Sequence, residues 1–223
     1  MKAIILLSGG LDSAVCMSIA HKEGYELMPV TFDYGQRHIR ELECAKAVAG
    51  YYGVSEHLVI HTDMNKMGGS ALTDNKINVP QGSLAEDGIP VTYVPARNLI
   101  FLSYALGYAE VQRAGSVFIG VNALDYSGYP DCRPEFIEKF QELADYSTKA
   151  ATQEGFLIKI KTPLINLSKA DIVRLGYDNK APLHLTSSCY NGRIAACGKC
   201  DSCKLRLKGF SDAGLKDLIE YEV

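Results

Sequence analysis

The sequence has no excess of positive charge. Its 223 residues include 23 Lys and Arg against 26 Asp and Glu, a formal net charge of −3. A protein that grips a nucleic-acid backbone neutralises phosphates and normally carries a strongly basic surface. The charge balance therefore argues against nucleic acid as a partner and favours small-molecule chemistry, although a local basic patch remains compatible with it.

Long hydrophobic runs are also lacking. The most apolar longer stretch, residues 99–111, is interrupted by Ser103, Gly107 and Glu110. It is shorter than the ~20 residues that a membrane span needs. The short apolar run at residues 3–7 ends in Ser-Gly-Gly and not in a small-residue cleavage site. We therefore expect a buried helix at the first position, a strand at the second, and no membrane association.

The cysteines do not form the even set that a disulfide framework requires. There are seven, an odd number that predicts reduced thiols and a cytoplasmic location. Cys197, Cys200 and Cys203 are spaced three apart, and Cys189 lies eight residues upstream. Four thiolates suit one tetrahedral zinc ion in a closed, structural site, although an iron–sulfur cluster also uses four thiolates. The remaining cysteines are predicted not to be ligands: Cys16, Cys44 and Cys132.

Two common nucleotide-binding motifs are missing as well. No G-x-G-x-x-G occurs, and the nearest approach to G-x-x-x-x-G-K-[ST], at residues 192–199, has one residue too many and is followed by Cys200. In their place, Ser8-Gly9-Gly10-Leu11-Asp12-Ser13 follows the first predicted strand and opens the first predicted helix. Its glycines let the backbone approach an anion, and the helix start presents free N–H groups. We expect this loop to bind ATP phosphates; a simple capped turn is the alternative.

Roles within this site follow from side-chain chemistry. Ser8 and Ser13 can add hydroxyl donors, and Asp12 can cap the helix or help to hold Mg²⁺. The loop has no Walker lysine, so cations must come from elsewhere, and Arg97 and Lys169 at predicted helix starts are favoured over Lys161 and Arg193. The expected catalytic residues are Asp12, Arg97 and Lys169. The expected ATP-binding residues are Leu7, Ser8, Gly9, Gly10, Leu11, Asp12, Ser13, Ala14, Val15, Cys16 and Met17.

Hydrophobic periodicity predicts an α/β fold. Strands are expected at residues 3–7, 27–32, 56–60, 116–121 and 156–160, and helices at 12–22, 39–52, 98–114, 134–152 and 168–175. This alternation favours a parallel sheet with helices on both faces and ligands at the carboxyl ends of its strands. We expect an ATP-binding domain over residues 1–185 and a cysteine-bearing segment over 186–223. Within the first, residues 63–95 break the rhythm and are interpreted as an active-site lid, with a surface insertion as the alternative.

The loop at residues 8–13 matches every defined position of S-G-G-x-D-S, and the chain thereby resembles the PP-loop ATP pyrophosphatases. That resemblance implies a Rossmann-like fold of the HUP type, with ATP and Mg²⁺ used to adenylate a substrate oxygen and release pyrophosphate. Further segments resemble the QueC family of queuosine biosynthesis over nearly the whole chain: TFDYGQRH at 31–38, VPARN at 94–98, GVNALDYSGYPDCR at 120–133, CYNG at 189–192 and CGKCDSC at 197–203.

The QueC resemblance implies conversion of 7-carboxy-7-deazaguanine, ammonia and ATP to the nitrile preQ0, one structural Zn²⁺ per chain, and a homodimer. It favours zinc over an iron–sulfur cluster. A deazaguanine offers a flat face for tyrosine stacking and a donor edge for a carboxylate. The expected substrate-binding residues lie in the loop after the fourth strand: Asp125, Tyr126, Tyr129 and Asp131. A Gly/Pro/Asp turn with solvated tyrosines is the alternative for this loop.

Two other functions compete with this interpretation. A tRNA-thiolating enzyme of the same superfamily should show a basic tRNA-binding appendage and a catalytic cysteine pair, and the acidic balance counts against it. A zinc-ribbon binding module would leave the phosphate loop without a role. Asp33 and His38 are further candidates for proton transfer, although an Asp at a strand end and a solvated His are equally ordinary.

Overall fold

A computed structural model describes residues 1–37, 40–74, 76–80, 88–124 and 129–222 of the protein. Strands and helices alternate along most of this length, as the sequence predicts. The strands are β1 (Lys2–Leu6), β2 (Glu26–Asp33), β3 (Leu58–His61), β4 (Ser116–Phe118) and β5 (Lys159–Lys161). The α-helices are α1 (Leu11–Lys22), α2 (Arg40–Tyr51), α3 (Arg97–Gln112), α4 (Pro134–Ser147), α5 (Lys149–Glu154), α6 (Lys169–Asp178) and α7 (Asp201–Ala213). Short 3-10 turns are η1 (Met64–Met67), η2 (Pro130–Cys132) and η3 (Leu183–Leu185).

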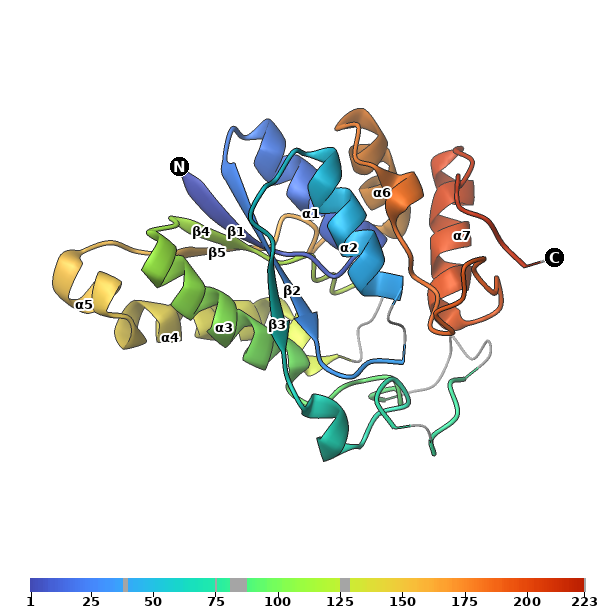
Figure 1. Cartoon of the computed structure of the whole chain (residues 1–223), viewed down its shortest axis with the longest axis horizontal. Coiled ribbons are helices and arrows are strands. Elements are labelled where there is room, and N and C mark those ends of the chain that lie inside the picture. The colour runs from blue at the N-terminus through green and yellow to red at the C-terminus, as the bar shows by residue number, and fades with distance from the viewer. Residues whose placement is uncertain (38–39, 75, 81–87, 125–128, 223) are drawn as a thin grey trace.

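All five strands form one parallel sheet in the order β3-β2-β1-β4-β5. Helices α3, α4 and α5 cover one side of it, whereas α1, α2, α6 and α7 lie on the other (Figure 1). After Lys2, the central strand β1 is wholly apolar and buried, because it is covered on both faces. The predicted Rossmann-like α/β fold is therefore confirmed. Among the described helices, none has the length and apolar character needed to cross a membrane.

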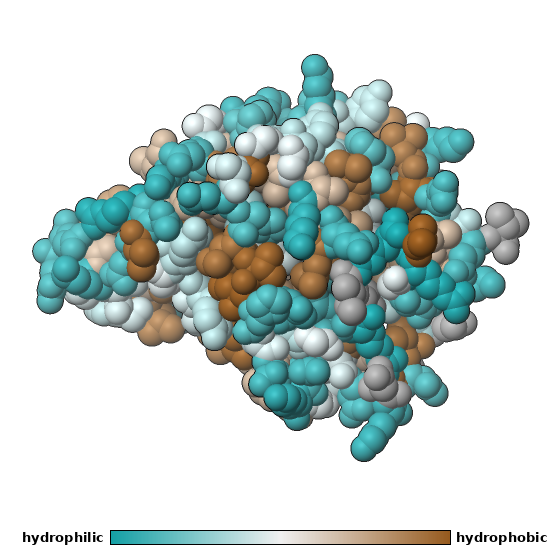
Figure 2. Space-filling view, in the orientation of Figure 1, coloured by the Kyte–Doolittle hydropathy of each residue, from teal (hydrophilic) through white to brown (hydrophobic). Residues whose placement is uncertain are grey.

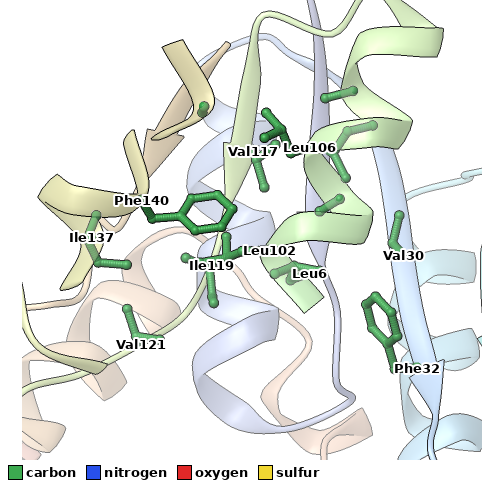
Figure 3. Close-up of a cluster of buried hydrophobic side chains, with 14 of the residues drawn as sticks. Leu6, Val30, Phe32, Leu102, Leu106, Val117, Ile119, Val121, Ile137 and Phe140 are labelled. Atoms are coloured by element: carbon green, nitrogen blue, oxygen red, sulfur yellow. The ribbon is translucent and has the colours of Figure 1, made fainter. Parts of the chain in front are cut away.

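Hydrophobic packing between the sheet and the α3–α4 layer fixes the strand ends (Figure 3). Leu6 ends β1, Val30 lies in β2 and Ile119 directly follows β4, and all three belong to the same buried cluster as Leu102 of α3. A second cluster, between the sheet and α1, α2 and α6, includes Phe118. The edge strand β3 is only half buried, and hydrophobic side chains gather near the middle of the face that carries it (Figure 2). The rigid core thus presents three strand ends to one side of the molecule.

Three predicted elements differ from the structure, and the first is the strand expected at residues 156–160, which is found at Lys159–Lys161. The fourth strand ends at Phe118 and not at residue 121, because the chain then passes under α1. A Cβ on Gly120 would lie 3.0 Å from the Asp12 carbonyl oxygen, so a larger residue would push the chain away from α1. The helix expected at residues 134–152 is broken at Thr148, whose backbone is extended and whose hydroxyl accepts the N–H of Ala151 at 3.3 Å. Thr148 is an N-cap, and it begins a new helix.

The segment interpreted as a lid is anchored over its described part. Ser70 and Ala71 are fully buried, and the Ala71 N–H donates to the Val91 carbonyl at 2.8 Å. The guanidinium of Arg37, from the loop after β2, donates to the carbonyl oxygens of Asp74 and, at 2.9 Å, Ile77. The described part of residues 63–95 is therefore packed on the domain at several points, and a lid function remains a prediction.

Candidate active site

A cavity of about 260 Å³ lies at the carboxyl ends of β1, β2 and β4. The loop before α1, the first turns of α2, α3 and α6, and the C-terminal segment form its walls. Ligands of open parallel sheets bind in this position, outside the carboxyl ends of the strands. The cavity is therefore the candidate active site.

The phosphate loop, residues 8–13, forms one wall through local hydrogen bonds. The Ser8 N–H donates to Ser13 Oγ at 3.2 Å, Ser13 Oγ donates to the Gly10 carbonyl at 2.9 Å, and the Gly10 N–H donates to Ser8 Oγ at 3.2 Å. Gly9 has a φ of +85°, and a Cβ there would lie 2.1 Å from the Glu41 carbonyl oxygen. The serine hydroxyls thus hold the loop in shape, and Gly9 lets it pack under α2.

Both favoured cations line the cavity. Lys169 Nζ, at the first position of α6, lies 2.8 Å from each carboxylate oxygen of Asp12. Arg97, at the first position of α3, has Nη1 3.4 Å from the Tyr34 hydroxyl. The two second-rank cations form ion pairs outside the cavity lining, Lys161 with Glu23 at 2.8 Å and Arg193 with Glu222 at 2.9 Å.

The expected ATP-binding residues divide into two groups. Those that line the cavity are Leu7, Ser8, Gly10, Leu11, Asp12 and Ser13. Gly9 is packed under α2, and the others lie inside the α1 core: Ala14, Val15, Cys16 and Met17. The side chains of Ala14, Val15, Cys16 and Met17 have no exposed surface. They cannot contact ATP, and they support the loop by packing beneath it.

The expected substrate-binding residues are placed only in part. Tyr129 lines the cavity; its hydroxyl lies 2.8 Å from Thr92 Oγ1, and its ring centroid lies 5.6 Å from that of Tyr93. Asp131 is buried and does not line the cavity; its Oδ2 accepts the Asn98 N–H at 3.0 Å, at the start of α3. Asp125 and Tyr126 lie outside the described residues. The contact of Asp131 thus supports the first turn of α3, which carries Arg97.

Several cavity residues were missed at the sequence level. The C-terminal segment contributes Ser187, Ser188, Tyr190, Ser202, Leu205 and Arg206, and other elements contribute Tyr34, Glu41 and Phe101. Tyr34 and Tyr190 lie in two of the quoted QueC-like segments, which offered a signal. Glu41 offered none, because an acid in the first turn of a helix is common as a partner of the helix dipole.

The acids near the end of β2 differ in their environments. Burial raises the pKa of Glu41 to about 7, although nearby Arg97 opposes this shift. Asp33 does not line the cavity, and its Oδ2 lies 3.1 Å from Nδ1 of His61. His38 lies outside the described residues. The structure therefore places the carboxyl group of Glu41, and not that of Asp33, in the cavity.

The four predicted cysteine ligands lie together. The Sγ atoms of Cys189, Cys197, Cys200 and Cys203 are all within 4.8 Å of one another, and all four residues are buried. Backbone N–H groups of residues 191 and 197 donate to Cys189 Sγ, and those of 199 and 200 donate to Cys197 Sγ, each at 3.4 Å. Hydrogen bonds from Cys200 and Cys203 lower the pKa of Cys189. Such a set of sulfur atoms can hold a metal ion.

Comparison with known proteins identifies the family. The family model of queuosine biosynthesis protein QueC matches residues 2–214. A 7-cyano-7-deazaguanine synthase 2 of Desulfitobacterium hafniense (strain Y51) is 62% identical over 99% of this chain and 93% of its own. The 7-cyano-7-deazaguanine synthase of Acetivibrio thermocellus is 60% identical over 99% of this chain and 97% of its own.

A solved structure supports the fold assignment. An NMN synthetase from Francisella tularensis superimposes with a TM-score of 0.51 at 20% identity, over 96% of this chain and 78% of its own. At this identity the likeness concerns the fold alone. The match to the QueC family model and the identity to its relatives, in contrast, extend over almost the entire length, and the chain belongs to the QueC family of queuosine biosynthesis proteins.

Proposed function

We propose that this chain converts 7-carboxy-7-deazaguanine, ammonia and ATP to 7-cyano-7-deazaguanine. The observation that carries the proposal is the 60 to 62% identity to relatives named as synthases of this nitrile, over nearly the full length of both chains. The cavity has the parts that the chemistry needs, because a phosphate loop, two cations and aromatic side chains all line it. Relatives at this identity favour the nitrile synthase over a tRNA-thiolating enzyme.

The residues of the cavity suggest how ATP is handled. The N–H groups at the start of α1 and the hydroxyl groups of the loop are suited to the β- and γ-phosphates. Lys169 and Arg97 supply positive charge where pyrophosphate develops and where the substrate carboxylate must approach ATP. Asp12 orients the Lys169 ammonium through both carboxylate oxygens. Mg²⁺, which accompanies ATP in such reactions, would add to this charge neutralisation.

A nitrile requires two rounds of activation, because both carboxylate oxygens must leave. In the first round ATP adenylates the carboxylate, and ammonia displaces AMP to give the primary amide. In the second, ATP activates the amide oxygen, which leaves as AMP while the nitrogen loses its protons. One phosphate loop can serve both rounds if the ring stays anchored while spent nucleotide leaves. Tyr129 and Tyr190, which share the cavity wall, are suited to stack on the ring.

We further propose that the four-cysteine cluster holds one structural Zn²⁺. With Zn–S bonds of ~2.3 Å, a tetrahedral site has sulfur atoms ~3.8 Å apart. The Sγ atoms of Cys197 and Cys203 are 3.9 Å apart, which fits this geometry. An iron–sulfur cluster encloses several metal atoms and would hold its thiolates farther apart. Four protein ligands leave no open position, so the ion would stabilise the C-terminal segment and take no part in the reaction.

The direct test incubates the metal-loaded protein with ATP, ammonium and 7-carboxy-7-deazaguanine and measures the nitrile by mass. The expected result is one nitrile formed for every two AMP. A second incubation supplies 7-amido-7-deazaguanine and ATP without ammonium, and nitrile is again expected. An enzyme that is active on the acid but inactive on the amide would contradict the shared-cavity pathway. The homodimer and the cytoplasmic location remain predictions, the first open to light scattering.

A further inference from the structure

Glu41 occupies an unusual position in the cavity wall. It lies in the first turn of α2, and its backbone carbonyl faces Gly9 of the phosphate loop. Its side chain shares the cavity with Asp12 and Arg97. Glu41 therefore lines the same cavity as the residues that are expected to hold the ATP phosphates.

Glu41 also differs from the other charged side chains of the cavity in its partners. Asp12 is bound by Lys169, Arg97 contacts the Tyr34 hydroxyl, and Arg206 is paired with Asp217. Within the described part of the chain, the Glu41 carboxylate has no hydrogen-bond partner. Glu41 is only partly buried and lines the cavity, so its unpaired carboxylate is accessible there to a cationic ligand.

The reaction needs a group of this kind. Ammonium is the predominant form of the nitrogen substrate at neutral pH, yet only ammonia has the lone pair that attacks the adenylate. Arg97 is a like charge that disfavours ammonium relative to ammonia in the same cavity. A carboxylate nearby can bind the cation and then accept its proton.

We propose that Glu41 binds the ammonium ion and is the base that converts it to ammonia. The proposal rests on the proposed nitrile synthesis. One N–H bond of ammonium breaks, its proton moves to a carboxylate oxygen of Glu41, and the electron pair stays on nitrogen. Ammonia then forms the C–N bond at the acyl carbon, and the C–O bond to AMP breaks with its electrons on the phosphate oxygen. The new nitrogen loses a second proton to solvent, and the protonated Glu41 releases its own before the next cycle.

The near-neutral pKa of Glu41 suits this role, because a base works best when its pKa is close to the working pH. The titratable and charged groups that share the cavity lining with Glu41 are Asp12, Tyr34, Arg97, Tyr129, Cys132, Lys169, Tyr190 and Arg206. Of these, Arg97 lowers the pKa of Glu41 against the larger effect of burial. Glu41 is therefore ionised above about pH 7, where the wild-type rate at fixed ammonium should rise.

The test is the variant Glu41→Gln, with Glu43→Gln as a matched control on the same helix turn, since Glu43 is exposed and outside the cavity lining. At about pH 7 and limiting ammonium, Glu41→Gln should lose about a hundredfold in nitrile formation. The loss should shrink as the pH rises toward about 9, where free ammonia becomes abundant. Glu41→Asp should recover part of the rate, and Glu43→Gln should follow the wild-type pH profile.

A step that needs no ammonia separates this role from a structural one. In a single turnover with ATP and 7-carboxy-7-deazaguanine but no ammonium, wild type and Glu41→Gln should release the same amount of pyrophosphate. Failure of the wild type to release it would count against the proposed function itself. If wild type makes nitrile and Glu41→Gln either keeps the wild-type rate at neutral pH or loses pyrophosphate release in parallel, the proposal for Glu41 is overturned.

A stability measurement completes the test. The folded-state pKa of Glu41 is raised, so the folded protein binds this proton more tightly than the unfolded chain, and stability is lost as the pH rises from about 4.5 to about 7. Glu41→Gln removes that loss and should melt at a higher temperature than wild type at pH 8, with little difference near pH 4. A higher melting temperature together with a lower rate shows that the variant is folded and that the carboxylate serves the reaction.

Discussion

The phosphate loop, residues 8–13, and the C-terminal segment, residues 186–222, wall the same cavity in different ways. The loop is shaped by hydrogen bonds between residues no more than five apart. The C-terminal wall depends on Arg206, which reaches Asp217, Thr186 and Leu183 at 11 to 23 residues' distance, and on the four-cysteine cluster. Local hydrogen bonds of two serine hydroxyls shape the first wall, whereas side-chain contacts between residues far apart in the sequence shape the second.

The two walls are joined at specific points. The Ser187 N–H donates to the Gly9 carbonyl at 3.0 Å. In α7, a Cβ on Gly209 would lie 2.3 Å from Lys169 Cγ, so the stem of Lys169 passes directly over Gly209. The C-terminal segment therefore supports the phosphate loop and Lys169. Substitutions in this segment should lower ATP turnover to different extents.

The largest effect is expected from the loop itself, through Gly10→Val. A Cβ on Gly10 lies 3.3 Å from Ser8 Oγ and 3.7 Å from the Ser187 carbonyl, so alanine is tolerated but branched methyl groups enter the phosphate site. ATP turnover should be abolished while the melting temperature changes little. Near-normal nitrile formation by folded Gly10→Val would remove the phosphate-loop assignment. Gly10→Ala is the matched control and should keep much of the activity.

The second effect concerns the cysteine cluster, through Cys200→Ser. Loss of one thiolate should lower metal content and cost on the order of 5 kcal/mol of folding free energy, because metal binding and folding are coupled. Metal analysis and thermal unfolding measure the two together. Cys44→Ser is the control, since Cys44 is buried in α2 away from the cluster. If the metal-free and metal-loaded proteins melted at the same temperature, the structural-metal proposal would be wrong.

The third effect tests the ion pair beneath the C-terminal wall, through Asp217→Asn. The side chains of Arg206 and Asp217 are 2% and 4% exposed, and removal of one partner from such a pair costs about 3 kcal/mol or more. Asp212→Asn is the control. It breaks an exposed ion pair with Lys208 in α7, the helix that carries Arg206, and should cost less than about 1 kcal/mol. Urea unfolding of both variants at neutral pH makes the comparison, and equal costs would contradict a structural role for the buried pair.

The same pair predicts a pH dependence. Burial raises the pKa of Asp217, but the hydrogen bond and charge of Arg206, together with hydrogen bonds from the Tyr221 hydroxyl and the Ile219 N–H, outweigh this effect, and the net pKa is lowered. Its stabilisation is present above the carboxyl pKa of the unfolded chain and is lost as the pH falls through the lower, folded-state pKa. The acid side of the stability curve should therefore be flatter in Asp217→Asn than in wild type.

The difference between the two walls, one built from local and one from long-range contacts, determines which features could be predicted from the sequence. The strand–helix order, the phosphate loop, the two cavity cations and the cysteine cluster follow from local patterns or a short spacing. The break at Thr148 was missed, because Thr is also found inside helices and its capping role needs the turn geometry. Glu41 and Arg206 were missed because the cavity joins them to the loop only through tertiary packing.

The smallest change in stability is expected for Gly209→Ala, which tests whether the C-terminal segment positions Lys169. An added methyl group collides with Lys169 near its backbone, at 2.3 Å from Cγ and 3.1 Å from Cβ, so α6 and α7 must shift slightly. Such overpacking costs ~1–3 kcal/mol, while alanine gains ~1 kcal/mol of helix propensity over glycine. Net stability should therefore fall by no more than about 2 kcal/mol. Lys169 Nζ would nevertheless move from its position between the two Asp12 oxygens.

Displacement of the Lys169 ammonium should lower kcat about tenfold, because catalysis at the reacting phosphate is sensitive to the position of the charge on a scale of about 1 Å. Gly107→Ala in α3 is the matched control, since nothing lies within 4 Å of its added Cβ. It should gain about 0.5–1 kcal/mol and keep its rate. If Gly209→Ala kept the wild-type kcat, the C-terminal segment would stabilise the fold without positioning Lys169. If kcat fell while the metal content stayed full, the segment would act on the reaction through α7.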